Sequence, residues 1–223
     1  MNVLGLDTAT ASTAVALAGP DGWLSEQRDV VAPGDRPQHA QSLLALAAKL
    51  LAAGGVGWQE IGLLAVGVGP GGYTGLRIGL ATAHGIAQAS GAQLMGVGTL
   101  RALAEPVSGR SVAAVVDARR GEAFLAVYRD GEELLAPRVA QPEQLARLAL
   151  AGGPETLAIG DGALRFRALI EDGGVAVAPT ESRLHGVSAA AICRLAVGGS
   201  GTPAIPDYLR PSDAELALGG GRR

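Results

Sequence analysis

The chain has 223 residues, a formal net charge of -3 and only 17% charged residues. Glycine (34) and proline (12) reach a level at which disorder becomes a candidate, but the hydrophobic fraction of 48% favours a folded protein. The single cysteine, Cys193, excludes an internal disulfide framework and a cysteine-rich zinc site. The weak negative charge provides no electrostatic footprint for direct nucleic-acid binding, and only one of the 18 basic residues, Lys49, is a lysine.

In chain order, the first half is predicted to form strands and two helices. Apolar runs separated by polar turns predict strands at residues 3–7, 13–17, 23–30, 63–68 and 94–97. The first helix is expected to start near Asp35 and Pro37 and to end at Gly54-Gly55, because apolar residues recur at helical spacing between them. The second helix follows a glycine-rich loop, with Thr74 as a candidate N-cap and an end near Gly91.

The second half is predicted to repeat this order. Strands are expected at residues 112–117, 122–128, 131–139, 156–159 and 175–178, and helices at 142–150, 163–170 and 187–197. Each half opens with an apolar strand that ends in aspartate, followed by a tight turn and a returning strand. This weak repeat predicts an α/β protein of two related lobes, residues 1–104 and 105–223. The Gly/Pro-rich tail from Gly198 is expected to pack back on the first lobe, and residues 219–223 to be disordered.

The two aspartates that end these strands, Asp7 and Asp117, are candidate ligand-binding residues. Ligands of α/β proteins often bind where strands end, and hairpins of this layout cradle phosphates through turns that contain glycine. The first turn, with Thr8 and Thr10, has no glycine, and the second places Arg119 two residues after its aspartate. A nucleotide site formed by these five residues and a purely structural role for the aspartates both remain open. Turn preferences favour the structural role.

Glycine is concentrated between Gly67 and Gly79. This segment follows a strand and precedes a helix, which suits an anion site at a helix N-terminus. However, it lacks the Lys-Ser/Thr pair of a P-loop, and it fits the dinucleotide fingerprint only loosely. Within the helix, small residues recur every four positions, at Gly75, Gly79, Ala83 and Ala87. Each glycine lowers the stability of a helix by about 1 kcal/mol relative to alanine, so its presence suggests a packing reason. This small-residue row predicts close packing, either within the chain or against a partner's helix.

Histidine and cysteine form no recognisable catalytic pattern. His39, His84 and His185 lie far apart, so no helical pair predicts a metal site. No Gly-x-Ser-x-Gly elbow is present, and Cys193 lies in an apolar run typical of a core residue. The uncharged stretch 78–100 contains glycine, glutamine and histidine, so no membrane span is expected. The N-terminus does not resemble a signal peptide, and a cytoplasmic location is expected.

Several segments match a known family in the right order along nearly the whole chain. They are Leu4-Gly5-Leu6-Asp7-Thr8-Ala9-Thr10, the run from Val66 to Gly79, the run from Gly96 to Leu100, the run from Val116 to Glu122, and Tyr208-Leu209-Arg210. The glycine-rich strand-to-helix segment is specific, and its Gly72-Tyr73, where Ser-Phe is common, is a mild departure. On these residues the chain resembles the TsaB (YeaZ) family, bacterial proteins of tRNA threonylcarbamoyladenosine synthesis.

The resemblance implies the ASKHA fold of actin and sugar kinases, with two RNase H-like lobes. It also implies a non-catalytic scaffold subunit without a metal or cofactor of its own, with any ATP or ADP bound at a subunit interface. The implied partners are TsaD, TsaE, tRNA through the complex, and a second copy when the chain is alone. TsaD is the catalytic subunit that transfers threonylcarbamoyl from threonylcarbamoyl-AMP to N6 of the adenosine next to the anticodon, and TsaE is an ATPase.

The resemblance further implies where partners bind. Family members pair with TsaD, and with themselves, through two helices that correspond here to residues 38–51 and 74–89. The residues expected at this interface are His39, Leu43, Pro70, Gly71, Gly72, Tyr73, Thr74, Gly75, Leu76, Arg77, Gly79, Leu80 and Ala83. Two other functions remain open. One is an ASKHA ATPase or kinase that uses Asp7 and Asp117, and the other is a glycoprotease-like peptidase, for which the sequence supplies neither a zinc site nor an evident nucleophile.

Overall fold

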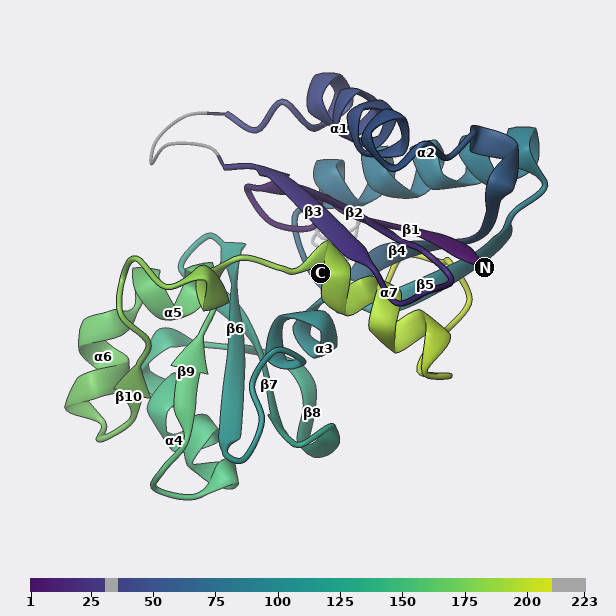
Figure 1. The fold of residues 1–223 in the computed structure, drawn as a ribbon. Coiled ribbons are helices and arrows are strands. Elements are labelled where there is room, and N and C mark those ends of the chain that lie inside the picture. The colour runs from purple at the N-terminus through teal and green to yellow at the C-terminus, as the bar shows by residue number, and fades with distance from the viewer. Residues whose placement is uncertain (31–35, 210–223) are drawn as a thin grey trace.

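The computed structural model describes residues 1–30 and 36–209, which form two lobes, each built on a five-stranded sheet (Figure 1). The first sheet has the order β3-β2-β1-β4-β5 and the second the order β10-β9-β6-β7-β8. In each sheet, three antiparallel strands are followed by two strands parallel to the first. This repeat confirms the predicted α/β fold with two related lobes.

Every strand predicted from the apolar runs is present, with small shifts of its ends. The strands are β1 Asn2–Asp7, β2 Thr13–Ala18, β3 Leu24–Asp29, β4 Ile61–Gly69, β5 Gln93–Gly98, β6 Ser111–Arg119, β7 Glu122–Arg129, β8 Glu132–Ala140, β9 Leu157–Ile159 and β10 Ala176–Val177. The central strands are buried on both faces, which explains their continuous apolar sequence. In β1, for example, Leu4 and Leu6 enter one core and Val3 enters another.

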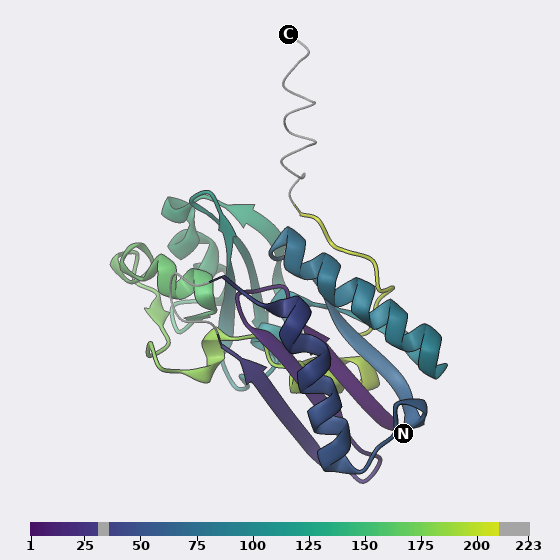
Figure 2. The same ribbon diagram turned by 90° about the horizontal axis from the view of Figure 1, so that it is seen from above.

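Helices cover both faces of the first sheet. Helices α1 (His39–Gly54) and α2 (Tyr73–Ser90) lie side by side on one face, and α7 (Ala189–Val197) lies on the other (Figures 1 and 2). Helix α3 (Thr99–Ala104), which follows the first sheet in sequence, packs against β6 and β7 of the second. Because α7 returns to the first sheet while α3 reaches the second, a shared core that includes Leu103 and Ile192 joins the lobes.

Several helix predictions differ from the structure. The N-cap of α2 is Gly72 and not Thr74, because Gly72 has extended backbone angles and its carbonyl accepts the Leu76 N–H at 2.9 Å. The predicted helix 163–170 is split at Phe166, which has non-helical backbone angles, into α5 (Asp161–Arg165) and α6 (Arg167–Asp172).

The other differences concern short elements and helix ends. The predicted helix 142–150 consists of α4 (Leu145–Ala149) flanked by 3-10 turns. Helix α3 was not predicted, since six residues are too few to establish a helical period. The expected helix start at Asp35 lies outside the described residues, and Pro37 precedes α1. No described helix has the length and apolar character needed to cross a bilayer.

After α7 the chain returns along the first lobe. Gly96 and Thr202 exchange two backbone hydrogen bonds, of 2.7 and 2.8 Å, and the Asp207 N–H donates to the Val68 carbonyl at 2.8 Å. Residues 201–209, called the strap below, therefore run along β4, β5 and α2 (Figure 2). Residues 210–223, which include the Arg210 of the C-terminal motif and the predicted disordered end, lie outside the described residues.

Candidate functional site

The turns after β1 and β6 meet the N-terminus of α2 at a cavity of about 300 Å³. The first turn contributes residues 8–11, α2 contributes residues 72–75, and the second lobe contributes Asp117, Arg119 and Asp161. Four of the five residues predicted for a nucleotide site, all except Asp7, therefore line one cavity. We call this region the cleft.

Asp7 is buried at the end of β1, with 1% of its surface exposed. Its Oδ1 accepts the Ala9 N–H at 3.0 Å, whereas its Oδ2 has no hydrogen-bond partner within the described chain. Burial away from water raises the pKa of Asp7 to about 7, although the Ala9 N–H and the charge of Arg28 act in the opposite direction. Gly67 provides the space for this carboxyl, because a Cβ there would lie 2.0 Å from Oδ2.

Asp117, the equivalent residue of the second lobe, is surrounded by arginine. Its Oδ2 accepts Arg165 Nη1 at 2.8 Å and Arg119 Nη1 at 3.5 Å, and its Oδ1 accepts the Arg119 backbone N–H at 2.9 Å. The Asp117 N–H donates to Asp161 Oδ1 at 3.0 Å, and burial raises the pKa of that aspartate. Arg119 and Arg120 have φ values of 63° and 52°, a left-handed conformation that costs of order 1 kcal/mol per residue.

The glycines of α2 pack against the first turn of the same chain. A Cβ on Gly75 would lie 2.0 Å from the Thr8 carbonyl oxygen, and a Cβ on Gly79 would lie 2.3 Å from Thr8 Oγ1. The Thr8 hydroxyl donates to the Gly75 carbonyl at 2.7 Å. Ala83 continues the row and is fully buried. The small-residue row therefore packs α2 against its own lobe. These positions are buried within the chain and cannot contact a partner's helix.

The residues predicted for the partner interface divide into buried and exposed groups. Eight are buried in the described chain: His39, Leu43, Pro70, Gly75, Leu76, Gly79, Leu80 and Ala83. Gly71 is half-buried, and Gly72, Tyr73, Thr74 and Arg77 are exposed. The buried side chains support the helices from below, as with Leu43 in the core under α1 and α2. His39 Nδ1 pairs with the Thr13 hydroxyl at 2.9 Å, and burial lowers the pKa of this histidine.

Tyr73, Arg77 and Tyr208 form an exposed stack where the strap reaches α2. The ring centroids of the two tyrosines are 5.2 Å apart, and the Arg77 guanidinium carbon lies 4.0 Å from the Tyr73 centroid. Arg77 Nε donates to Tyr208 Oη at 3.1 Å. The sequence placed Tyr208 only within a C-terminal motif. Because 131 residues separate it from Arg77, no local pattern could have paired them.

Apart from Thr74 and Arg77, sequence reasoning missed the residues on the solvent side of α1 and α2, which we call the outer helix face (Figure 2). Its residues are Gln41, Leu44, Ala45, Ala48, Lys49 and Ala52 on α1, and Thr74, Arg77, Ala81, His84, Gly85, Gln88 and Ala89 on α2. Small side chains predominate, and neither helix contains aspartate or glutamate. The helical spacing that identified the buried positions could also have identified these exposed residues, because they lie on the opposite side of the same helices.

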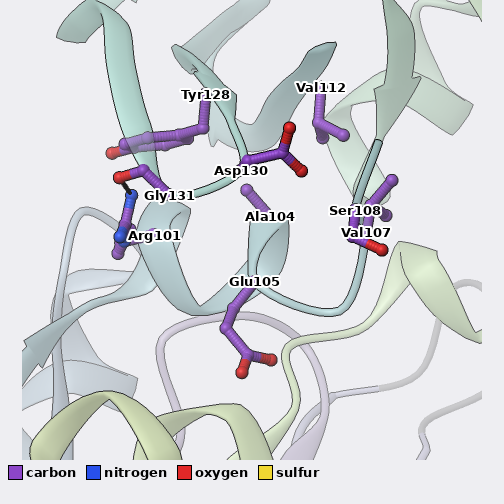
Figure 3. Close-up of a pocket in the computed structure, with 9 residues that line it drawn as sticks. All are labelled: Arg101, Ala104, Glu105, Val107, Ser108, Val112, Tyr128, Asp130 and Gly131. Carbon is purple, nitrogen blue, oxygen red and sulfur yellow. Dashed lines mark hydrogen bonds between the residues drawn. The ribbon is translucent and has the colours of Figure 1, made fainter. Parts of the chain in front are cut away.

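A second cavity, of about 370 Å³, lies beside α3 in the second lobe (Figure 3). Arg101 of α3 donates to the Gly131 carbonyl, and its guanidinium carbon lies 5.3 Å from the centroid of the Tyr128 ring. Glu105 accepts two hydrogen bonds from Arg194 of α7, at 2.6 and 2.7 Å. The first contact ties α3 to the second lobe, and the second ties the end of α3 to α7.

The histidines and the cysteine have structural surroundings. Within residues 1–30 and 36–209, no group of three or more His, Cys, Asp and Glu side chains could hold a metal ion. His84 Nε2 contacts the Ala204 carbonyl at 3.3 Å, and His185 is buried among backbone carbonyls. Cys193 lies in the shared core, as predicted, and burial raises the pKa of its thiol to about 12.

Comparison with known proteins connects this architecture to one family. A family model described as "TsaD: tRNA N6-adenosine threonylcarbamoyltransferase" matches residues 31–192. The TsaB protein of Escherichia coli is 34% identical over 136 residues, which is 59% of this chain and 57% of that protein. The solved structure of YeaZ from Pseudomonas aeruginosa has a TM-score of 0.77 at 29% identity, over 93% of this chain and 99% of that one. The chain belongs to the TsaB (YeaZ) family.

The family assignment agrees with the motifs and with the topology. Each lobe has the RNase H-like strand order, and the whole-chain match to YeaZ confirms the ASKHA fold that the resemblance implied. An uncharacterized protein of Mycobacterium leprae is 36% identical over 163 residues, which is 70% of this chain but 44% of that protein. The chain therefore spans about half the length of these two curated relatives.

Proposed function

We propose that this chain is a non-catalytic scaffold subunit of the complex that transfers threonylcarbamoyl from threonylcarbamoyl-AMP to N6 of the adenosine next to the tRNA anticodon. The observation that carries the proposal is the similarity to the E. coli TsaB protein, a tRNA threonylcarbamoyladenosine biosynthesis protein. In this proposal the chain works in the cytoplasm with TsaD as the catalytic partner and TsaE as the ATPase. It meets tRNA through the complex and self-associates when alone.

The cleft supports the non-catalytic part of the proposal, because its Asp117 carboxylate and its Gly72 N–H are engaged within the chain. Arg165 and Arg119 neutralise the Asp117 carboxylate that would face a metal-bound phosphate. The Gly72 N–H at the start of α2, a natural phosphate donor, is bonded to the Ala9 carbonyl at 2.7 Å. A nucleotide would have to displace these contacts, so any ATP or ADP is proposed to lie at a subunit interface instead.

The outer helix face supports the scaffold part of the proposal. It lies on two adjacent helices and ends at an exposed stack of two tyrosines and an arginine, residue types that protein interfaces favour. The proposed contact with TsaD therefore uses the outer helix face together with Tyr73, Thr74 and Arg77. The buried row of Gly75, Gly79 and Ala83 positions the helices from beneath.

Reconstitution of tRNA modification tests the proposal. TsaD, TsaE, threonylcarbamoyl-AMP and unmodified tRNA should form threonylcarbamoyladenosine only when this chain is added, measured by mass spectrometry of nucleosides. An equal yield without the chain would contradict the scaffold role.

The competing ATPase hypothesis is separated by Asp117→Asn and by calorimetric titration of the isolated chain with Mg-ATP. The scaffold hypothesis expects modification near the wild-type rate and no tight nucleotide binding. Tight binding that Asp117→Asn abolishes would favour the ATPase.

A further inference from the structure

We infer that a cavity beside the end of α7 binds an uncharged, apolar small molecule that contains an aromatic ring. The cavity has a volume of about 520 Å³ and lies between the start of β1, the turn that joins β2 to β3, and the last residues of α7. Helix α7 covers the face of the first sheet opposite α1 and α2 (Figure 1). Among the described residues, the cavity shares no lining residue with the outer helix face or with the cleft.

Small residues leave this space open. Ala18, the last residue of β2, lines the cavity with only a methyl group, and glycine follows it at the start of the turn. Helix α7 ends at Val197, and the next two residues are again glycine. Because these positions carry little or no side chain, the part of the sheet beside the end of α7 is lined by the chain without being filled.

Trp23 forms one wall of the cavity, and its ring has a fixed position. A Cβ on Gly19 would lie 1.8 Å from the indole Nε1, and a Cβ on Gly54 would lie 2.9 Å from Cη2, so the ring rests against both glycines. The Gly19 N–H donates to the Trp23 carbonyl at 3.0 Å, which closes the turn. The residue remains 36% exposed. It therefore offers a rigid aromatic surface on which a second aromatic ring can pack.

Exposed apolar side chains gather around the same cavity. Met1, Leu24 and Val197 are 61%, 39% and 62% exposed, and all three line it together with Trp23. Single apolar side chains are common on protein surfaces, whereas a group of them around a space of several hundred Å³ is typical of a ligand pocket. A ligand that covers these side chains removes apolar surface from water, which favours binding.

The charge beside the cavity is balanced within the chain. Arg194 is the only charged side chain among the described residues that line it, and it donates to Glu105 through Nε and Nη2 at 2.7 and 2.6 Å. Asp21 lies in the turn but is exposed to water and does not line the cavity. Burial raises the pKa of the Cys193 thiol to about 12, so this group is uncharged at neutral pH. A charged ligand would lose hydration without gaining an unpaired opposite charge, which favours an uncharged one.

Two fluorescent probes with the same rings test the cavity and the class of ligand. N-phenyl-1-naphthylamine is uncharged, and 1-anilinonaphthalene-8-sulfonate adds a sulfonate group to the same ring system. Each is titrated into the full chain, and the rise in fluorescence on leaving water measures binding. The uncharged probe should bind at one saturable site, about tenfold or more tightly than the sulfonate.

Three variants separate a cavity from a generally apolar surface. Ala18→Leu adds apolar atoms inside the cavity, and Val197→Asp places a charge at its rim. Each should weaken binding of the uncharged probe about tenfold or more. Ile205→Asp is the matched control, because Ile205 is 66% exposed, much like Val197, but does not line the cavity. This control should leave the affinity within about twofold of the wild type.

Each contrary outcome has a defined meaning. Binding that Ala18→Leu leaves unchanged or strengthens would overturn the inference, since exposed apolar surface alone would then hold the probe. Equal weakening by Val197→Asp and Ile205→Asp would overturn it for the same reason. Tighter binding of the sulfonate would overturn the uncharged class of ligand, and the absence of saturable binding up to the solubility limit would overturn the site.

Circular dichroism shows whether each variant is folded. If Ala18→Leu does not fold, the contrast between Val197→Asp and Ile205→Asp decides alone, because both replace exposed side chains. The inference does not rest on the proposed function, so either can fail without the other.

Discussion

The turns after β1 and β6 occupy the same place in the two lobes, yet they surround their aspartates in opposite ways. Asp7 is buried with a single N–H donor on one oxygen, whereas Asp117 accepts hydrogen bonds from Arg119 and Arg165. The backbone design is shared, because a helix starts beside each strand end and has a glycine at the closest approach. Topology places the two aspartates at equivalent strand ends, while neighbouring side chains decide their chemistry.

The largest effect is expected from adding a side-chain atom at the point where α2 comes closest to the turn after β1. Gly75→Ala places a Cβ 2.0 Å from the Thr8 carbonyl oxygen and should lower the free energy of unfolding by about 3 kcal/mol, measured by urea denaturation. Gly162→Ala, with a Cβ 2.8 Å from the Val116 carbonyl carbon, makes the same change in the second lobe and should cost less.

Gly85→Ala is the matched control on α2. No atom lies within 4 Å of its Cβ position, so alanine should stabilise the helix by about 1 kcal/mol. If Gly75→Ala were as stable as the wild type, close packing of α2 against the first turn would be contradicted.

The second prediction separates the two aspartates by pH. A carboxyl whose pKa rises from 3.8 to about 7 on folding binds more protons in the folded state between those values. The free energy of unfolding therefore falls as pH rises through this window. The amide side chain introduced by Asp7→Asn cannot titrate. The free energy of unfolding of this variant, relative to that of the wild type, should therefore improve by about 2 kcal/mol between pH 5 and pH 8, because each pH unit below the folded pKa contributes at most about 1.4 kcal/mol.

Urea denaturation at both pH values measures this difference. Asp21→Asn, on the exposed turn between β2 and β3, is the control and should give the same relative stability at both. A pH-independent effect of Asp7→Asn would show that Asp7 is ionised in the folded chain throughout.

The third prediction concerns the arginines around Asp117. Arg165→Gln removes the 2.8 Å ion pair and should lower the free energy of unfolding by about 1 kcal/mol, because Arg165 is 45% exposed and partly screened by water. Arg119→Gln removes the longer pair, of 3.5 Å, and should cost less. A double-mutant cycle with Asp117→Asn measures the coupling, and zero coupling for Arg165 would contradict a neutralised cleft.

The smallest effect is expected at the end of the strap. Tyr208→Phe removes only the hydroxyl that accepts a hydrogen bond from Arg77 and should cost about 0.5 kcal/mol. Tyr208→Ala also removes the ring that contacts Tyr73 and should cost about 1 kcal/mol. Thermal unfolding of both variants measures the contrast. Equal losses would mean that the ring contributes nothing to holding the strap.

Local patterns predicted much of the fold and part of the cleft. The apolar runs that end in Asp7 and Asp117 predicted two equivalent hairpins, and the structure brings Asp117 together with Thr8, Thr10 and Arg119 around one cavity. The pairing of Asp117 with Arg165, 48 residues later, has no local signature. The missed N-cap has the same origin, since the Gly72 N–H at the start of α2 donates to Ala9, a residue far away in the sequence.

By itself, the sequence determined the helical and strand spacing of apolar residues, the repeat of two lobes and the family motifs. These features depend on residues close together in the chain. The tertiary structure decided what each pattern faces. The row of Gly75 and Gly79 faces Thr8 of the same lobe, and the opposite side of the helix is exposed. It also decided that burial raises the pKa of Asp7 to about 7, since desolvation depends on neighbours that only the folded chain assembles.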